Sequence, residues 1–311
     1  MRYGLDACAD VGPRATPSRL RLRVSKITYR PDWLNIVFLS SVHVLALYGL
    51  YYMVFDDRFS WWSLALGLLW FALCGLSITG GYHRLFSHPT YKARWPLQLF
   101  YLLFGAASVQ NSALKWSADH RRHHAKVDKD EDPYNIKKGF WWAHIGWVLR
   151  VASDRGIQGV PDLAANRLIQ FQHRFYVPLA ILFSSVVPLC LGLIWGDPLG
   201  ALLIAGFVRL AFQYHATFAV NSVAHYIGKR PYTTSNSARD SWITAIVTLG
   251  EGYHNFHHRF QIDYRNGVRF YQLDPTKWFV WTMSKIGVTW DLKRTSREKI
   301  ESAKRQRLAH G

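Results

Sequence analysis

Cysteine is scarce in this chain of 311 residues, which contains only Cys8, Cys74 and Cys190. The sequence has no C-x-x-C pair, and two of the three cysteines lie in apolar runs. It therefore argues against a disulfide framework, a zinc ribbon and an iron–sulfur cluster held by cysteines.

Acidic residues are also few, because 20 Asp and Glu face 38 Lys and Arg, for a formal net charge of +18. Such a charge predicts an anionic partner: nucleic acid, an anionic membrane face or a phosphorylated substrate. No nucleic-acid-binding module accompanies it, so we expect no nucleic acid partner and favour a membrane and a charged substrate.

What the chain has in abundance is apolar and aromatic side chains, at 50% and 15% of its residues. The first 26 residues carry charges and prolines without an apolar stretch, so we interpret 1–26 as a basic tail and not as a signal peptide. Four later runs reach the length needed to cross a bilayer: Leu34–Phe55, Phe59–Tyr82, Phe175–Gly196 and Pro198–Val220. Three of them lack charge, and Arg209 in the fourth must face protein, water or the interface.

Short links join these runs into two helical hairpins, and basic residues gather outside them. By the positive-inside rule, both termini and the segment Arg84–Lys138 are expected in the cytoplasm. The run Trp95–Leu114 is uncharged, yet as a span it would place His88 and His120 on opposite sides of the membrane. We therefore expect it to be a re-entrant or interfacial helix.

The predicted fold is thus an all-α membrane protein: four transmembrane helices, the re-entrant or interfacial helix, and a helical cytoplasmic cap. The predicted organisation is a basic tail at 1–26, an integral-membrane domain at 27–297 and a basic C-terminal tail at 298–311.

Histidines carry the chemical signal. Eight of the 14 fall in three clusters, HRLFSH, HRRHH and HNFHH, which contain His83, His88, His120, His123, His124, His254, His257 and His258. Spacings of three and four place side chains on one helix face, so each HxxHH can direct several imidazoles to one point. A ninth candidate, His225, ends the segment NSVAH, which begins at Asn221.

The topology places all nine on the cytoplasmic side, although it was drawn from charge and hydropathy alone. Nine imidazoles exceed the needs of one metal but suit two, with Asn221 acting directly or through water. Imidazole binds iron, zinc, copper and nickel, so the ligands do not identify the metal. They therefore predict a dimetal site in the cap.

The sequence is less specific about the roles of the remaining histidines and of the nearby carboxylates. Five histidines are expected to be hydrogen-bonded structural residues: His43, His144, His173, His215 and His310. Four carboxylates near the clusters could orient imidazoles or could be ordinary solvated or helix-capping acids: Asp119, Asp128, Asp132 and Glu251.

Four segments together resemble the membrane fatty acyl desaturases, and most closely their acyl-CoA Δ9 branch: GGYHRLFSHPTYKA, WSADHRRHHAKVDKDEDPYNIKKGFWWAHIGW, NSVAHYIGKRPY and GEGYHNFHHRFQIDYR. The resemblance runs from about Ile27 to Arg297. It implies two iron ions held by the nine histidines, with Asn221 completing the shell through water. It also implies O2-dependent desaturation of a long-chain fatty acyl-CoA, giving a cis double bond at Δ9 in unsaturated fatty acid biosynthesis.

The resemblance also assigns substrate contacts. Asn111, Trp116 and Asp119 fall where the family contacts the thioester and nucleotide ends, while Phe71 and Gly75 are candidates to limit chain length. Ala118 replaces the Arg of the animal enzymes and Phe218 a frequent Trp, and the first change puts one nucleotide contact in doubt. Independently of the family, basic residues offer charge for coenzyme A phosphates or for lipid headgroups: Lys137, Lys138, Arg150, Lys229 and Arg230.

Desaturation needs two electrons per turnover, and the sequence shows no obvious means of accepting them. It has no G-x-G-x-x-G, no cysteine cluster and no haem domain after the third cluster, so a separate ferredoxin, rubredoxin-like or cytochrome donor with its reductase is expected. Alternatives on the same scaffold are a phospholipid-linked acyl desaturase and a fatty acyl hydroxylase. A membrane metal transporter or sensor is a further alternative, disfavoured because its histidines should line the spans.

Overall fold

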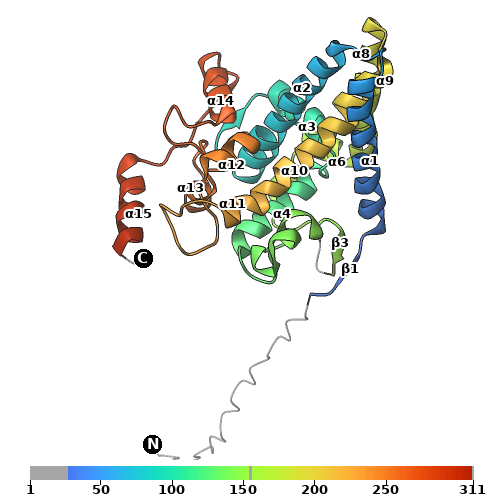
Figure 1. Cartoon of the computed structure of the whole chain (residues 1–311). Helices are drawn as coiled ribbons and strands as arrows, with labels where there is room; N and C mark the ends of the chain where they lie inside the picture. The colour runs from blue at the N-terminus through green and yellow to red at the C-terminus, as the bar shows by residue number, and fades with distance from the viewer. Residues whose placement is uncertain (1–26, 154–155, 310–311) are drawn as a thin grey trace, which may run out of the picture.

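The computed structural model describes residues 27–153 and 156–309, and within them the fold is mainly helical (Figure 1). The basic tail expected at 1–26 lies outside the described residues, as do Cys8 and His310.

Four helices are long and apolar enough to cross a membrane: Trp33–Phe55, Trp61–Ser87, Tyr176–Trp195 and Pro198–Tyr226. The first is α1, and the second is α2 (Trp61–Leu76) continued by the π-helical η1 (Ser77–Ser87). The third consists of α7 (Tyr176–Ile181), η4 (Leu182–Val186), α8 (Val187–Gly192) and η5 (Leu193–Trp195). The fourth consists of α9 (Pro198–Ala201), η6 (Leu202–Val208), α10 (Arg209–Asn221) and α11 (Val223–Tyr226). The four expected spans are confirmed.

The second and fourth helices run beyond their predicted ends at Tyr82 and Val220. The predicted second span stops just before His83 and Arg84, but Arg84 is 1% exposed and ion-paired to buried carboxylates. Because this charge is neutralised inside the protein, the helix continues and carries His83 with it.

The two hairpins are tied together at the end of the spans remote from the histidines. Asp197 caps α9 by accepting from the Gly200 amide, and it also accepts from the Tyr52 hydroxyl, the Ser63 hydroxyl and the Ser60 amide. This one buried carboxylate thus links both interhelical turns.

Arg209 faces protein, as its position in an apolar run required. Arg209 is 3% exposed, and its guanidinium donates to the carbonyls of Ala205 and Ala107 and to the Gln213 amide oxygen. These acceptors replace part of the water that the charge would lose on burial.

Helix α3 (Trp95–Ala107) has 13 residues, too few to span, which agrees with the expected re-entrant or interfacial helix. It ends earlier than the predicted Leu114. Val109 and Asn111 adopt positive φ, so the chain turns here, and α4 (Ala113–Lys126) begins as a separate helix capped by Ser112.

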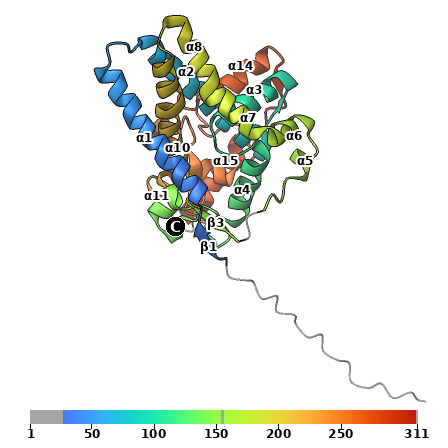
Figure 2. The same ribbon diagram turned by 90° about the vertical axis from the view of Figure 1, so that its right-hand side faces the viewer.

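The cap is built from short helices and two small sheets. Its helices are α4, η2 (Ile136–Lys138), η3 (Trp142–Gly146), α5 (Pro161–Ala164), α6 (Arg167–Arg174), α12 (Trp242–Val247), α13 (His254–Arg259), α14 (Pro275–Lys285) and α15 (Arg297–Ala309). Strand β1 (Tyr29–Pro31) pairs antiparallel with β3 (Arg150–Ala152), and β2 (Lys92–Ala93) with β4 (Thr289–Trp290). Figure 2 shows α4 and α6 on one side of the cap and α1 on the other. The β2–β4 pair joins the C-terminal segment to the chain just after the first histidine cluster.

Candidate metal centre

The nine clustered histidines come from four elements that the tertiary structure brings together. His83 lies on η1 and His88 directly follows it, the second cluster lies on α4, the third on α13, and His225 on α11. Eight of the nine are buried and His124 is partly buried. The sequence prediction that all nine gather at one place agrees with this arrangement.

The imidazoles form two groups, within each of which one nitrogen of every ring lies within 4.8 Å of the others. The five-histidine group contains His83, His88, His120, His124 and His257. The four-histidine group contains His123, His225, His254 and His258. Two groups of imidazoles agree with the expectation that nine suit two metals.

Each HxxHH cluster directs two imidazoles to one group, as the spacing allowed, and its third imidazole to the other group. On α4, the i,i+4 pair His120 and His124 joins the five-histidine group, while His123 joins the other. On α13, the i,i+4 pair His254 and His258 joins the four-histidine group, while His257 joins the five-histidine group. The two helices therefore bridge the two groups.

The ring nitrogens face one another at short distances. In the five-histidine group, Nε2 of His88 lies 2.8 Å from Nε2 of His120, and Nε2 of His257 lies 3.0 Å from those of His83 and His124. In the four-histidine group, Nε2 of His258 lies 3.1 Å from that of His254 and 3.3 Å from that of His123. Ring nitrogens that face one another this closely could bind one cation between them.

The protonation state fits the same reading. Burial, reinforced by the neighbouring imidazoles, holds the pKa well below its usual range for His88, His120, His124, His254, His257 and His258. Neutral imidazoles have a free lone pair for a metal. In addition, Nε2 of His225, whose Nδ1 bonds Ser237, is buried without a hydrogen-bond partner among the described residues. The residues present therefore fit two transition-metal ions.

Carboxylates hold the outer nitrogens of selected histidines. The Nδ1 of His83 lies 2.9 Å from Glu251, and that of His123 lies 2.8 Å from Asp132. Asp128 acts one step further out, because it binds the Ser237 hydroxyl, which lies 2.7 Å from Nδ1 of His225. These contacts orient the rings and set their tautomers.

Ser237 was missed by sequence reasoning, since nothing in its polar loop distinguishes it. The fourth candidate carboxylate, Asp119, is buried and pairs with Lys115 at 3.2 Å.

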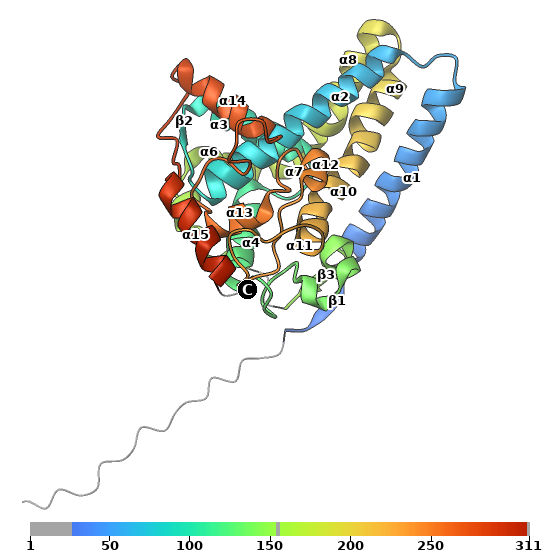
Figure 3. The ribbon, with the colours of Figure 1, turned by 60° about the vertical axis from the view of Figure 1, so that its left-hand side comes forward.

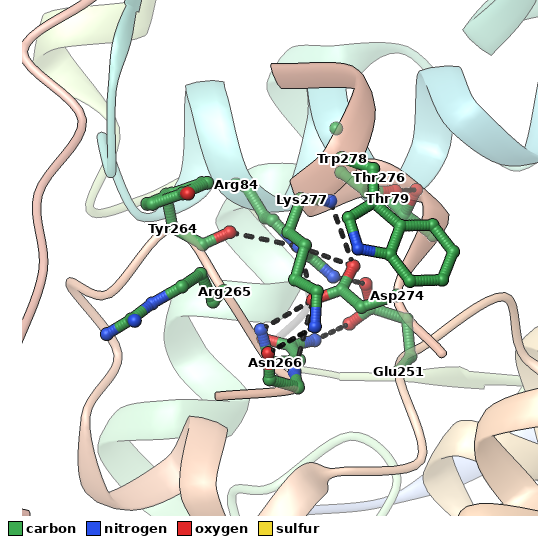
Figure 4. Close-up of polar contacts among 12 residues, drawn as sticks. Thr79, Arg84, Glu251, Tyr264, Arg265, Asn266, Asp274, Thr276, Lys277 and Trp278 are labelled. Atoms are coloured by element: carbon green, nitrogen blue, oxygen red, sulfur yellow. Dashed lines mark hydrogen bonds and ion pairs between the residues drawn. The ribbon is translucent and has the colours of Figure 1, made fainter. Parts of the chain in front are cut away.

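Glu251 belongs to a buried network that Figure 4 shows in detail. The Arg84 guanidinium donates to Glu251 at 2.9 Å and lies 2.9 Å from Asp274, and Asn266 donates to the other Glu251 oxygen. Burial alone would raise the pKa of Glu251, but the charges and hydrogen bonds of His83 and Arg84 outweigh it and lower it to about 2. The carboxylate is therefore held as an anion beside His83.

A cavity of about 470 Å³ passes along both histidine groups. It is lined by His83 and His120 of the five-histidine group and by His123 and His254 of the four-histidine group. Much of its wall is apolar, with side chains from α1, α2, η1 and α10: Phe38, Leu39, Phe71, Ile78, Tyr214 and Phe218. The shape and lining suit an extended apolar ligand.

Four of the substrate-contact candidates and Asn221 line this cavity: Phe71, Gly75, Asn111, Trp116 and Asn221. The Trp116 ring stacks on His120 with 4.8 Å between centroids. Sequence reasoning missed Gln110 and Thr217, which are also in the wall and are joined by a 2.9 Å hydrogen bond. It also missed Leu249, which packs against Gly75.

Three of the substrate-contact candidates are not among the residues that line the cavity: Asp119, Lys137 and Lys138. Lys137 is exposed, and the Lys138 ammonium donates to the Tyr29 hydroxyl at 2.7 Å. Their contact with a substrate stays a prediction.

The histidines expected to be structural are hydrogen-bonded within the described residues. His43, His215 and His144 form a chain with 3.0 Å between successive ring nitrogens, and His144 continues it to the Ser222 hydroxyl. His173 bonds the Ser112 hydroxyl at 2.7 Å.

Comparisons with known proteins agree with this site. Residues 59–291 match the family model described as fatty acid desaturase. The chain is 46% identical over 264 residues to a probable acyl-CoA desaturase of Schizosaccharomyces pombe, covering 84% of this chain and 54% of that protein. It is 42% identical over 282 residues to acyl-CoA desaturase 1 of Saccharomyces cerevisiae, covering 88% and 54%.

A third relative, the Delta(9)-fatty-acid desaturase fat-7 of Caenorhabditis elegans, is 36% identical over 92% of this chain and 86% of its own length. The chain thus spans about half the length of the two fungal relatives.

Proposed function

The chain belongs to the fatty acid desaturase family, and from this premise we propose that it is a membrane-bound acyl-CoA desaturase. It takes two hydrogens from adjacent carbons of a long-chain fatty acyl-CoA, which leaves a cis double bond at Δ9. Two electrons and two protons from outside, together with those hydrogens, reduce O2 to two molecules of water.

The proposed cofactor is a pair of non-haem irons, one in each histidine group. The iron pair, when bound, supplies the activation of O2 that side-chain acid–base chemistry cannot provide. The five-histidine and four-histidine groups would hold the two ions, with Asn221 completing the coordination shell through water. Glu251 and Asp132 keep His83 and His123 oriented with their inner nitrogens unprotonated.

The cavity supports the choice of substrate. Its apolar wall would hold an acyl chain in water-free surroundings beside both histidine groups, and its polar residues Gln110, Asn111 and Thr217 lie where a thioester could be oriented. Leu249 packs against Gly75 in the same wall, so this part of the cavity would limit the acyl length. We assign the nucleotide end to Asp119, Lys137 and Lys138, by the family resemblance and by charge.

The metal centre and both termini are proposed to lie on the cytoplasmic side of the membrane, because the basic segments flank the spans there. The electrons would come from a separate ferredoxin, rubredoxin-like or cytochrome donor with its reductase. An acidic donor would suit the net charge of +18.

The observation that carries the proposal is that one apolar cavity is lined by ligands of both histidine groups. The test is gas chromatography of fatty acids from a desaturase-deficient host that expresses this chain with an electron donor. A new monounsaturated acid is expected, and derivatisation of its double bond gives the position directly.

The controls distinguish chemistry from folding. His120→Ala, within the five-histidine group, should abolish the product, whereas His43→Ala, on α1 outside both groups, should keep it. A His120→Ala protein that still makes the product would overturn the assignment of the metal site.

Supplying acyl-CoA or intact phospholipid to purified protein separates the substrate classes. Conversion of phospholipid alone would indicate the phospholipid-linked desaturase, and hydroxylated acid without unsaturated acid would indicate the hydroxylase. Elemental analysis should find two irons per chain.

A further inference from the structure

One segment of the cap, between α11 and α12, lies against the four-histidine group. Residues 228–240, the lid segment, lie outside the helices, and their backbone joins two elements that carry ligands of this group. The Arg239 amide donates at 2.7 Å to the carbonyl of Ala224, which directly precedes His225. The Arg239 carbonyl accepts from the His254 amide at 3.2 Å. The lid segment therefore bridges α11 and α13 at the positions of two ligands.

The lid segment also sets the tautomer of one ligand. The Ser237 hydroxyl lies 2.7 Å from Nδ1 of His225, and it donates its proton to Asp128. Since that proton is used, the hydroxyl accepts from Nδ1 of His225, which leaves Nε2 unprotonated toward a metal. The Ser237 amide donates to the same carboxylate at 2.7 Å, so backbone and side chain of the lid segment are fixed together.

Asn255 of α13 fastens the lid segment from the side of the ligands. Its side chain is fully buried. The amide oxygen accepts from the backbone N–H groups of Tyr232 at 2.9 Å and Thr233 at 3.3 Å. The amide nitrogen donates to the carbonyls of Thr233 at 2.8 Å and Ala238 at 2.9 Å. One side chain thus satisfies four backbone groups of a segment that has no helix of its own.

Helix α15 is a second support of the lid segment. The Arg307 guanidinium donates to the Arg230 carbonyl at 3.1 Å, and the Lys304 ammonium lies 5.8 Å from the centre of the Tyr232 ring. The same ring packs edge-on against Phe256 of α13, with 5.2 Å between centroids. Tyr232 is therefore contacted both by α15 and by the helix that carries three of the histidines.

A narrow apolar face holds α15 itself. Of its 13 residues only Ile300 and Ala303 are buried, whereas Leu308 near its end is 71% exposed. Figure 3 shows α15 at the outer edge of the cap, on the side of α13. Because so little of the helix is buried, a single substitution on this face can weaken its docking.

We propose that α15 and the lid segment retain the metal of the four-histidine group, and that undocking of α15 opens the route by which this one ion exchanges. The contacts of the lid segment reach His225 and His254, which both belong to that group. The two ions of the centre therefore differ in how readily they leave. The inference rests on the metal centre of the proposed function and adds positioning residues that touch neither metal nor substrate: Ile300, Lys304 and Arg307.

The test is iron release from the full-length, iron-loaded protein in detergent, with a reductant and without O2, to a chelator that becomes coloured on binding Fe(II). Wild type should release its two ions slowly. In Ile300→Asp, one ion per chain should leave about 10–100-fold faster, while the other leaves at the wild-type rate. Leu308→Asp is the matched control, because it places the same charge at an exposed position of the same helix and should change neither rate. Ile300→Val, which stays apolar, should release both ions slowly.

Two further measurements assign the fast ion. Adding His225→Ala to Ile300→Asp should remove the fast phase and keep the slow one, because the four-histidine group is then incomplete. Hydrogen–deuterium exchange of Ile300→Asp should accelerate in residues 228–240 and stay at the wild-type rate in α2. General loss of folding would instead accelerate both.

Three results overturn the proposal: release of both ions of Ile300→Asp at one common rate, a fast phase that survives His225→Ala, and unchanged release despite faster exchange of the lid segment. If circular dichroism shows that Ile300→Asp does not fold, Lys304→Ala combined with Arg307→Ala takes its place, with the same expected result.

Product analysis keeps this inference separate from the proposed function. A wild-type protein that holds two ions but makes no unsaturated acid overturns the desaturation, and its release kinetics still decide the role of α15. A protein that makes the product, but whose Ile300→Asp variant loses both ions together, overturns the role of α15 alone.

Discussion

Replacing Arg84 by Met should destabilise the protein strongly, although this residue contacts neither histidine group through its side chain. The guanidinium lies between two buried carboxylates, Glu251 and Asp274, and donates to the Tyr264 carbonyl as well. Met fills a similar volume but leaves both carboxylates without their shared cation.

The expected loss of stability depends on the hydrogen bonds that each carboxylate retains. Breaking a buried ion pair by removing one partner costs about 3–5 kcal/mol. Asp274 retains three backbone donors, from Asn266, Gly267 and Lys277, and Glu251 retains the side chains of His83 and Asn266. We therefore expect the lower end, about 3 kcal/mol, or roughly 5 °C in melting temperature for a chain of this length.

The assay is thermal unfolding of the detergent-solubilised protein at one scan rate, followed by tryptophan fluorescence. Arg84→Lys should fall between wild type and Arg84→Met, since an ammonium cannot bind both carboxylates in the forked geometry of a guanidinium. Arg58→Met is the matched control. Arg58 is exposed, and within the described residues it forms an ion pair with Asp56 alone. The melting temperature of Arg58→Met should therefore equal that of wild type.

A double-mutant cycle tests whether the loss of the shared cation causes the destabilisation. In the Arg84→Met background, Asp274→Asn should cost less than in wild type, because it removes a carboxylate that has already lost its cation. Strictly additive effects of the two substitutions, or a melting temperature of Arg84→Met equal to that of wild type, would refute the reasoning.

Three further outcomes are expected. Asp132→Asn and Glu251→Gln should each lower metal affinity about 10–100-fold, measured by metal retention during chelator challenge, because each carboxylate orients one ligating histidine. Gly75→Leu should shift products toward shorter acids by gas chromatography, since its side chain would meet Leu249 inside the cavity. Burial raises the pKa of Asp240 from 3.8 to about 7, so the folded state retains a proton that the unfolded state releases between these values. The contribution of Asp240 to the free energy of unfolding should therefore fall as pH rises from about 4 to about 7, by at most about 1.4 kcal/mol per pH unit, so the difference in melting temperature between wild type and Asp240→Asn should change over this range.

Each outcome has its own control. Glu131→Gln removes a carboxylate that pairs with Lys126 at the surface and should leave metal retention unchanged. Leu69→Phe adds volume to an outward-facing position of α2 and should leave the product length unchanged. Unchanged metal retention in both carboxylate variants, unchanged chain length in Gly75→Leu, or parallel melting curves for Asp240→Asn and wild type would each contradict the corresponding argument.

Much of the fold could be predicted because its main signals are local. A run of some 20 uncharged apolar residues has few alternatives to a membrane span, and all four spans occur where the sequence indicated. The errors lie at ends: the second span continues past Tyr82 and α3 stops before Leu114. Whether Arg84 ends a helix depends on Glu251 and Asp274, which lie more than 160 residues away along the chain.

The sequence by itself singled out the nine candidate metal-binding histidines, since residue type and local spacing need no knowledge of distant contacts. Only the tertiary structure decided which histidine belongs to which group. The i,i+4 pair of α4 joins the five-histidine group and that of α13 joins the four-histidine group, while the third ring of each cluster joins the opposite group. Likewise, the tertiary structure alone joined Glu251 to His83, Asp132 to His123 and Ser237 to His225. The type of a candidate ligand follows from residue identity. The group that it joins and the residue that orients it depend on the packing angles between helices, which no local pattern encodes.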